Sequence, residues 1–375
     1  MTKSLIDLNS LNESRSTQQK MDELLARGER KNTKSAYQSS IKHFLEVWEG
    51  LLPATEEQIC RYLTEMSDQW TVSTLNLRLA ALANWHKTMG FPDTTKSQKI
   101  KQLMRGIREK HGQPPRQADP LTLVHLRAIV AFLDGLADSA LQVLHEPLPA
   151  NCNDHVRKER EALFRAARKD LLRASRDKAL LLVGFWRAFR SDEISRMDVE
   201  HIQAVKGQEM KIFLTHSKTD REAQGKTYLL PCLRELCPVT AYTNWLEDSG
   251  IVKGPVFRAI NRWGRLQESG LNTKSIDKIL KRFCREAGVK GQMSTHSMRH
   301  GFANWASDEG WELYRLMKYV GWSNAANAER YIRPFYDFGE ISLTRDRLSE
   351  RSNKPINELG TTIVGSAVRE DDLEE

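Results

Sequence analysis

The chain has 375 residues, of which 40% are hydrophobic and 28% charged, so it can form two globular domains and is not a disordered chain. Its formal net charge of +8 favours a polyanionic partner such as nucleic acid, because lysine and arginine neutralise phosphates. No apolar run approaches the ~18 residues of a spanning helix, and the polar N-terminus lacks the apolar segment of a signal peptide. We therefore expect a cytoplasmic protein that does not enter a membrane.

The cysteines are odd in number and scattered, and no two of them form a Cys-x-x-Cys pair. This spacing argues against a disulfide framework and against a zinc ribbon. We expect reduced thiols and no metal or other cofactor. The five residues are Cys60, Cys152, Cys232, Cys237 and Cys284.

The first half of the chain indicates a helical domain. Residues 1–25 are polar and we expect a loose arm, followed by a helical domain over residues 26–112. Apolar side chains recur at helical spacing in three segments, and a further helix starts after Pro53 with Thr55 as its N-cap. The three segments are residues 33–48, 72–89 and 96–111.

The last of these helices has an apolar face and a cationic face. Ile100, Met104 and Ile107 belong to its apolar stripe. The cations can form a solvated surface, or they can lie along a DNA backbone, which the sequence leaves open. The candidate DNA-binding residues are Lys96, Lys99, Lys101, Arg105 and Arg108.

Residues 113–120 form the predicted linker, because closely spaced prolines cannot continue a helix. The second domain is predicted over 121–345 and a polar, acidic tail over 346–375. A helix opens the domain at 121–133, and residues 135–170 are interpreted as a surface insertion with a turn-rich stretch and a highly charged helix.

The rest of the second domain is predicted to contain a β-hairpin and then helices. Residues 211–216 and 226–230 alternate as strands, and the polar segment between them is typical of a hairpin loop. Five helices follow, at 238–249, 272–287, 296–308, 311–319 and 325–333. The predicted fold class is mainly α with a small antiparallel β-sheet, in two domains.

Several polar residues in this domain stand in a distinctive order. Arg190 and Glu193 are three apart at a helix start, and Lys218 lies in the hairpin loop. His296 and Arg299 are also three apart, so they share one helix face and can hold one anion. Gly321 and Trp322 follow, and then Tyr331 nine residues after Trp322. Each feature alone is ordinary: a surface ion pair, a solvated lysine, a core tryptophan.

The ordered set resembles the active-site series of the tyrosine recombinase (phage integrase) family. Trp322 stands where most relatives carry histidine, which resembles the Cre-like branch. The resemblance spans the second domain, while the first domain resembles more weakly the family's helical core-binding domain. It implies a two-domain DNA clamp and a site-specific recombinase, working as a homotetramer on double-stranded DNA through a Holliday junction.

The resemblance also implies a role for each residue. Arg190, His296 and Arg299 surround the phosphate, because fixed donors stabilise the charge that builds up during attack. Trp322 adds an indole N–H and Glu193 supports the cluster. Tyr331 is the nucleophile that forms a 3′-phosphotyrosine, and Lys218 is the general acid for the leaving 5′ oxygen. Lys226 remains an alternative acid, and His300 has a secondary, structural role.

Three other functions compete with this interpretation. His296 and His300 have the spacing of zinc ligands on a helix, but the intervening Arg299 would repel the metal. A type IB topoisomerase uses a similar residue set and would relax supercoils without exchanging partners. A DNA-binding protein without catalysis would share the basic helix but would have no need for Tyr331.

Overall fold

The computed structural model describes residues 20–21, 31–113, 117–146, 153–215, 225–322, 324, 325 and 328. The chain divides into two compact units, residues 1–116 and 117–375. The division falls inside the stretch for which the sequence predicts a linker. Most of the predicted N-terminal arm and the whole predicted acidic tail lie outside the described residues.

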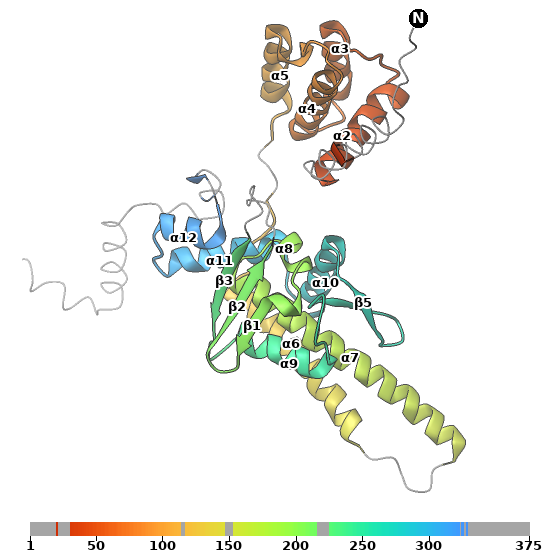
Figure 1. Ribbon diagram of the computed structural model, residues 1–375, viewed down its shortest axis with the longest axis vertical. Coiled ribbons are helices and arrows are strands. Elements are labelled where there is room, and N and C mark those ends of the chain that lie inside the picture. Colours follow the sequence, from red (N-terminus) through yellow and green to blue (C-terminus); the bar gives the residue numbers. More distant parts are fainter. Residues whose placement is uncertain are drawn as a thin grey trace, which may run out of the picture. The chain divides into compact units, whose positions relative to one another are not determined.

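The described part of the first unit is helical (Figure 1). Its helices are α2 (Lys31–Lys42), α3 (Glu56–Met66), α4 (Val72–Thr88) and α5 (Gln98–His111), with a π-helical turn η1 (His43–Val47) and a 3₁₀ turn η2 (Thr94–Lys96). Thr55 caps α3 as predicted, because its side chain accepts a hydrogen bond from the Gln58 backbone N–H. The core is aromatic and aliphatic, with Phe44, Tyr62 and Leu75 fully buried.

The basic helix α5 has the two faces that its sequence predicts. Ile100, Met104 and Ile107 are buried against the core of the first unit. The candidate DNA-binding cations are all exposed: Lys96 precedes the helix in η2, and the other four lie along it. Contact between this face and DNA stays a prediction.

The second unit contains two small antiparallel sheets. The first has the order β1 (Ile202–Val205), β2 (Glu209–Leu214), β3 (Lys226–Pro231), and the second pairs β4 (Arg258–Ile260) with β5 (Leu266–Gly270). The predicted hairpin is therefore confirmed, with Leu214 opposite Lys226 at its open end. Lys218 lies in the connecting loop, outside the described residues.

Helices pack around the first sheet in one hydrophobic core (Figure 1). They are α6 (Leu123–His145), α7 (Asp154–Trp186), α8 (Ser191–Ser195), α9 (Pro238–Ser249), α10 (Thr273–Glu286), α11 (Thr295–Asp308) and α12 (Leu313–Val320), with a 3₁₀ turn η3 (Val199–His201). The four predicted helices from 238 to 319 are thus confirmed within a few residues. The predicted helix at 325–333 lies almost entirely outside the described residues.

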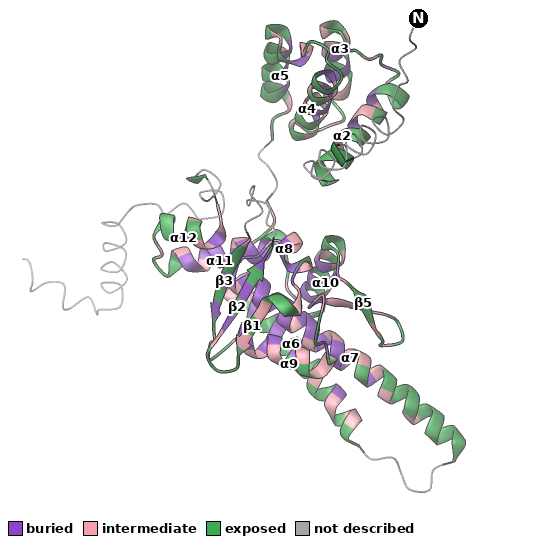
Figure 2. Ribbon diagram, in the orientation of Figure 1, coloured by how far each residue is buried: buried purple, intermediate pink, exposed green. Residues whose placement is uncertain are grey.

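The predicted insertion takes a different form from the one expected. α6 does not end near residue 133 but runs to His145, and α7 is one helix of 33 residues. The two helices pair as an arm, where Ala140, Ala167 and Leu171 form a small separate core. The apolar pattern of α6 is interrupted by Asp134, Gly135 and Asp138, and the helix was therefore predicted to end too early. Figure 2 shows that the outer half of α7 is mostly exposed.

α6 is also long and apolar enough to cross a membrane, judged by length and composition alone. Leu126, Ile129 and Leu133 of this helix lie in the core of the second unit. Charged side chains also occur along it, at Arg127 and Asp134. One face of α6 therefore packs into the second unit, and length and composition alone do not mark the helix as a membrane span.

Candidate active site

Arg190 lies at the turn between α7 and α8 and is held by Glu193. The Glu193 carboxylate accepts one hydrogen bond from Arg190 Nη1 at 3.0 Å and another from the Arg190 backbone N–H at 2.7 Å. The side chain of Glu193 is 5% exposed and that of Arg190 is 21% exposed. Because the carboxylate holds both the backbone and the side chain of Arg190, it fixes the direction in which the guanidinium points.

Arg299, on α11, joins this turn to the end of α12. Its Nη1 donates to the backbone oxygen of Ala188 at 2.7 Å, and its Nη2 donates to the backbone oxygen of Val320 at 2.7 Å. The residue is 3% exposed. Its Cζ atom also lies 5.4 Å from the centre of the Trp322 ring. Arg299 therefore brings the Arg190 turn, α11 and Trp322 together.

The two histidines of α11 have different surroundings. His296 lies in the first turn of α11, one turn before Arg299 on the same side, and it is exposed. The Nδ1 atom of His300 lies 3.0 Å from the backbone oxygen of Ala118, near the start of the second unit. His300 thus contacts the segment that enters this unit, and its structural role stays a prediction.

Arg187 also belongs to this region, although sequence reasoning missed it. Its guanidinium lies between two aromatic rings, 3.8 Å from the centre of Tyr319 and 4.7 Å from that of Tyr228. Arg187 Nη1 also donates to the backbone oxygen of Tyr319. Burial lowers the pKa of the Arg187 guanidinium, because the charge is removed from water. A cation in the aromatic run Phe185 to Phe189 was the signal that could have identified it.

The contacts of Arg187 connect three elements of the site. Tyr319 belongs to α12, and its hydroxyl donates to the backbone oxygen of Trp186 at 2.7 Å. Tyr228 belongs to β3, and the Nζ atom of Lys226 lies 5.4 Å from its ring centre. Arg187 therefore links the turn that carries Arg190 both to α12 and to the hairpin that carries Lys226.

Five of the seven predicted catalytic residues lie in the described part of the chain. Arg190, Glu193, Arg299 and Trp322 are connected by the contacts above, and His296 lies one turn from Arg299. Tyr331 and Lys218 lie outside the described residues. Of the guanidinium groups in the described cluster, Arg190 is partly exposed and its planar fork matches the oxygens of a phosphate, whereas Arg299 and Arg187 are buried and donate to backbone oxygens. Chemically, the cluster is suited to hold an anion and to stabilise added negative charge.

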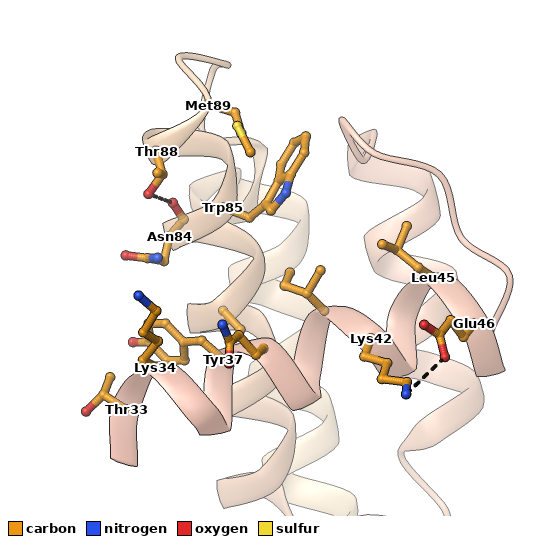
Figure 3. Close-up of a pocket in the computed structure, with 13 residues that line it drawn as sticks. Thr33, Lys34, Tyr37, Lys42, Leu45, Glu46, Asn84, Trp85, Thr88 and Met89 are labelled. Carbon is orange, nitrogen blue, oxygen red and sulfur yellow. Dashed lines mark hydrogen bonds and ion pairs between the residues drawn. The ribbon is translucent and has the colours of Figure 1, made fainter. Parts of the chain in front are cut away.

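The cavity in the first unit does not compete with this cluster as a candidate active site. A cavity of about 820 Å³ lies in the first unit between α2 and α4, and Figure 3 shows Tyr37 and Trp85 among its lining residues. It contains none of the predicted catalytic residues. Within the part of the chain that the structure describes, no three His, Cys, Asp or Glu side chains gather as a metal site.

Comparison with known proteins identifies relatives by sequence. The model of the phage integrase family matches residues 156–337, a range that contains all seven predicted catalytic positions. The chain is 26% identical over 300 residues to an integrase/recombinase xerD homologue of Selenomonas ruminantium, covering 78% of each protein. It is 25% identical over 138 residues to the tyrosine recombinase XerC of Chlamydia pneumoniae, which is 36% of this chain and 43% of that protein.

Solved structures share the fold. The Tn1549 transposon integrase in complex with transposon right end DNA has a TM-score of 0.53 at 11% identity, covering 88% of this chain and 98% of that one. The XerH site-specific recombinase bound to its palindromic difH substrate has a TM-score of 0.51 at 13% identity, covering 85% and 78%. The predicted fold class is confirmed by these similarities and by the elements described above.

Proposed function

The chain belongs to the phage integrase family, and on that premise we propose that it is a site-specific DNA recombinase that cuts and rejoins strands through a covalent bond to Tyr331. The observation that supports this most is the cluster in which Arg299 joins the Arg190 turn to Trp322. Such a cluster suits one backbone phosphate, because its donors are already fixed before the reaction begins.

The proposed first step is attack on the scissile phosphate. The Tyr331 hydroxyl releases its proton to solvent, its oxygen bonds to phosphorus, and the bond from phosphorus to the 5′ oxygen breaks. Arg190 and Arg299 stabilise the charge on the nonbridging oxygens, and His296 and Trp322 add further donors. Glu193 acts through Arg190, because it holds that guanidinium in place. The Cre-like character given by Trp322 stays a prediction.

The leaving 5′ oxygen needs a proton, and a hairpin lysine is the proposed donor. Lys218 is the first candidate, from its family resemblance. Lys226 is the alternative, and its Nζ atom lies near the Tyr228 ring that also contacts Arg187. The product is a 3′-phosphotyrosine, which conserves the bond energy, so rejoining by the reverse step needs neither ATP nor a metal.

We further propose that the protein acts on double-stranded DNA in the cytoplasm as a homotetramer, through a Holliday junction. The exposed cations of α5, together with Lys96, are the proposed backbone contacts of the first unit. Neutralised phosphates release counterions, so binding should weaken steeply with salt. Replacing Lys99, Lys101 and Arg105 together by alanine should reduce the slope of log affinity against log salt by about 3, measured by fluorescence anisotropy.

Tyr331→Phe provides the direct test of the proposed function. DNA that becomes covalently attached to the protein is first sequenced, and nicked suicide substrates are made with that sequence. The purified protein is incubated with these substrates, and the products are separated in SDS. The parent protein should form a protein–DNA adduct, whereas Tyr331→Phe should bind the same DNA and form none. Phenylalanine keeps the ring and removes only the nucleophilic oxygen. An adduct that persists in Tyr331→Phe would disprove the assignment.

A plasmid without target sites separates recombination from relaxation. A site-specific recombinase should leave the supercoils of this plasmid unchanged, while a type IB topoisomerase would relax them. Relaxation that depends on Tyr331 would retain the covalent chemistry and overturn the proposed biological reaction.

A further inference from the structure

Two cysteines of the second unit lie in contact. Cys232 follows β3 (Lys226–Pro231), and Cys237 is the N-cap residue of α9 (Pro238–Ser249). Their Sγ atoms are 3.3 Å apart, and both residues are partly exposed. The pair is therefore reachable by small molecules, and the two sulfurs need only a short movement to form a bond of about 2 Å.

The surroundings of Cys237 favour a reactive thiolate. Its Sγ accepts hydrogen bonds from the backbone N–H groups of Leu233 at 3.3 Å and of Thr240 at 3.4 Å. Burial opposes ionisation of Cys237, but hydrogen bonds from the Thr240 side chain and from these two N–H groups outweigh it and lower its pKa. The pKa of Cys232 is raised, chiefly because it shares a hydrogen bond with Cys237. Cys237 is thus the attacking sulfur and Cys232 the resolving one.

We propose that Cys232 and Cys237 are a redox modification site that closes to an intramolecular disulfide when it meets a low-molecular-weight disulfide of the glutathione type. The Cys237 thiolate attacks one sulfur of the small disulfide and expels one thiolate. Cys232 then loses its proton to solvent, attacks the Cys237 sulfur and expels the second thiolate. The cysteine pair loses two electrons and two protons, and the small disulfide is reduced to two thiols.

The loop between the two cysteines is connected to the candidate active site. Leu236 has a φ of 50°, and its backbone oxygen accepts a hydrogen bond from Trp186 Nε1 at 2.8 Å. The backbone oxygen of Trp186 in turn accepts a hydrogen bond from the Tyr319 hydroxyl, and Trp186 directly precedes Arg187. Drawing the sulfurs together changes the loop that contains Leu236, so the oxidised protein should have a displaced Arg187 turn and slower DNA cleavage. This consequence rests on the proposed function, whereas the disulfide itself does not.

Mass spectrometry of the full-length protein tests the modification without DNA. After treatment with oxidised glutathione, the parent protein should lose about 2 Da relative to the reduced form, and peptide mapping should join Cys232 to Cys237. Cys232→Ser should stop at a glutathione adduct on Cys237, and Cys60→Ser, the matched control, should behave like the parent. An unchanged mass, or a stable glutathione adduct in the parent protein, would overturn the proposal.

Cleavage of a suicide substrate tests the connection to the active site. Oxidation should slow cleavage by the parent protein about fivefold, the effect of losing one hydrogen bond, and a reductant should restore the rate. Cys232→Ser, also oxidised, should keep the rate of its reduced form. Equal rates for the oxidised and reduced parent would disprove the connection. No cleavage by the reduced parent would count against the proposed function instead.

Discussion

Replacing Arg299 by lysine or by alanine tests two tasks of this side chain: holding two backbone oxygens and stabilising the charge on the phosphate. The guanidinium holds the backbone oxygens of Ala188 and Val320 at once, each at 2.7 Å, and it is 3% exposed. A lysine ammonium keeps the positive charge, but it is a compact group without the planar fork that reaches both oxygens. Arg299→Lys should therefore leave one buried carbonyl without its donor, and Arg299→Ala should leave two.

The expected loss of stability follows from these two contacts. A buried acceptor that loses its donor costs about 1–3 kcal/mol, so the free energy of unfolding should fall by about 1–3 kcal/mol in Arg299→Lys and about 2–6 kcal/mol in Arg299→Ala. For a unit of this size, 1 kcal/mol corresponds to about 2–4 °C in Tm. Arg299→Lys should then melt about 2–12 °C below the parent protein. Both variants should also cleave about 10²–10³ times more slowly, as expected for a lost oxyanion donor.

Differential scanning calorimetry and suicide-substrate cleavage measure the two effects on the same samples. Arg285→Lys, on the exposed side of α10, is the matched control and should change neither. If Arg299→Ala melted within about 2 °C of the parent protein, the connection of Ala188 and Val320 through this residue would be refuted. Full cleavage by Arg299→Lys would refute the need for a planar fork.

Three further predictions concern the support of the site and the core of the first unit. Glu193→Gln should slow suicide-substrate cleavage about tenfold, because the amide cannot hold both donors of Arg190; an unchanged rate would exclude this positioning role. Ala188 has a φ of 51°, so Ala188→Val should lower the free energy of unfolding by about 1–3 kcal/mol in urea titration, while Ala188→Gly should stay within about 1 kcal/mol. Burial raises the pKa of Tyr62 to about 12 in the folded protein, against about 10 in the unfolded chain. The stability that the protonated phenol contributes is therefore fully present below a pH of about 10 and is lost as the pH rises through about 12. Tyr62→Phe should therefore flatten the alkaline loss of stability followed by circular dichroism, and an unaltered pH profile would contradict this assignment.

The helix boundaries that could be predicted are those marked by local chemistry. α9 begins and ends as predicted, because Pro238 occupies its first turn and Gly250 takes the left-handed conformation after its last. The strands β1, β4 and β5 were missed, since they have only three to five residues and no alternating run. Their formation depends on pairing with distant segments, which periodicity does not reveal.

The sequence predicted which residues belong to the candidate site, but it did not predict the hydrogen bonds and ring contacts that join them. Spacing alone placed His296 and Arg299 on one helix face. The partners of Arg299 are backbone oxygens 111 and 21 residues away, and a backbone oxygen leaves no mark on the sequence. Arg187 was missed for a related reason: arginine usually indicates a surface, and the two tyrosine rings that surround it come from other elements.

The length of α7 has a mechanical consequence. Its 33 residues form a rod of about 50 Å that ends at the turn carrying Arg187 and Arg190. The opposite end extends beyond the main core, and Arg168, near the middle of the helix, donates to the backbone oxygen of Asp248 at 2.7 Å. A pivot of about 5° around the core would displace the free end by a few ångströms and the turn by a smaller amount. A partner that bound the outer half of α7 would therefore be connected, through one continuous helix, to the turn that carries Arg187 and Arg190.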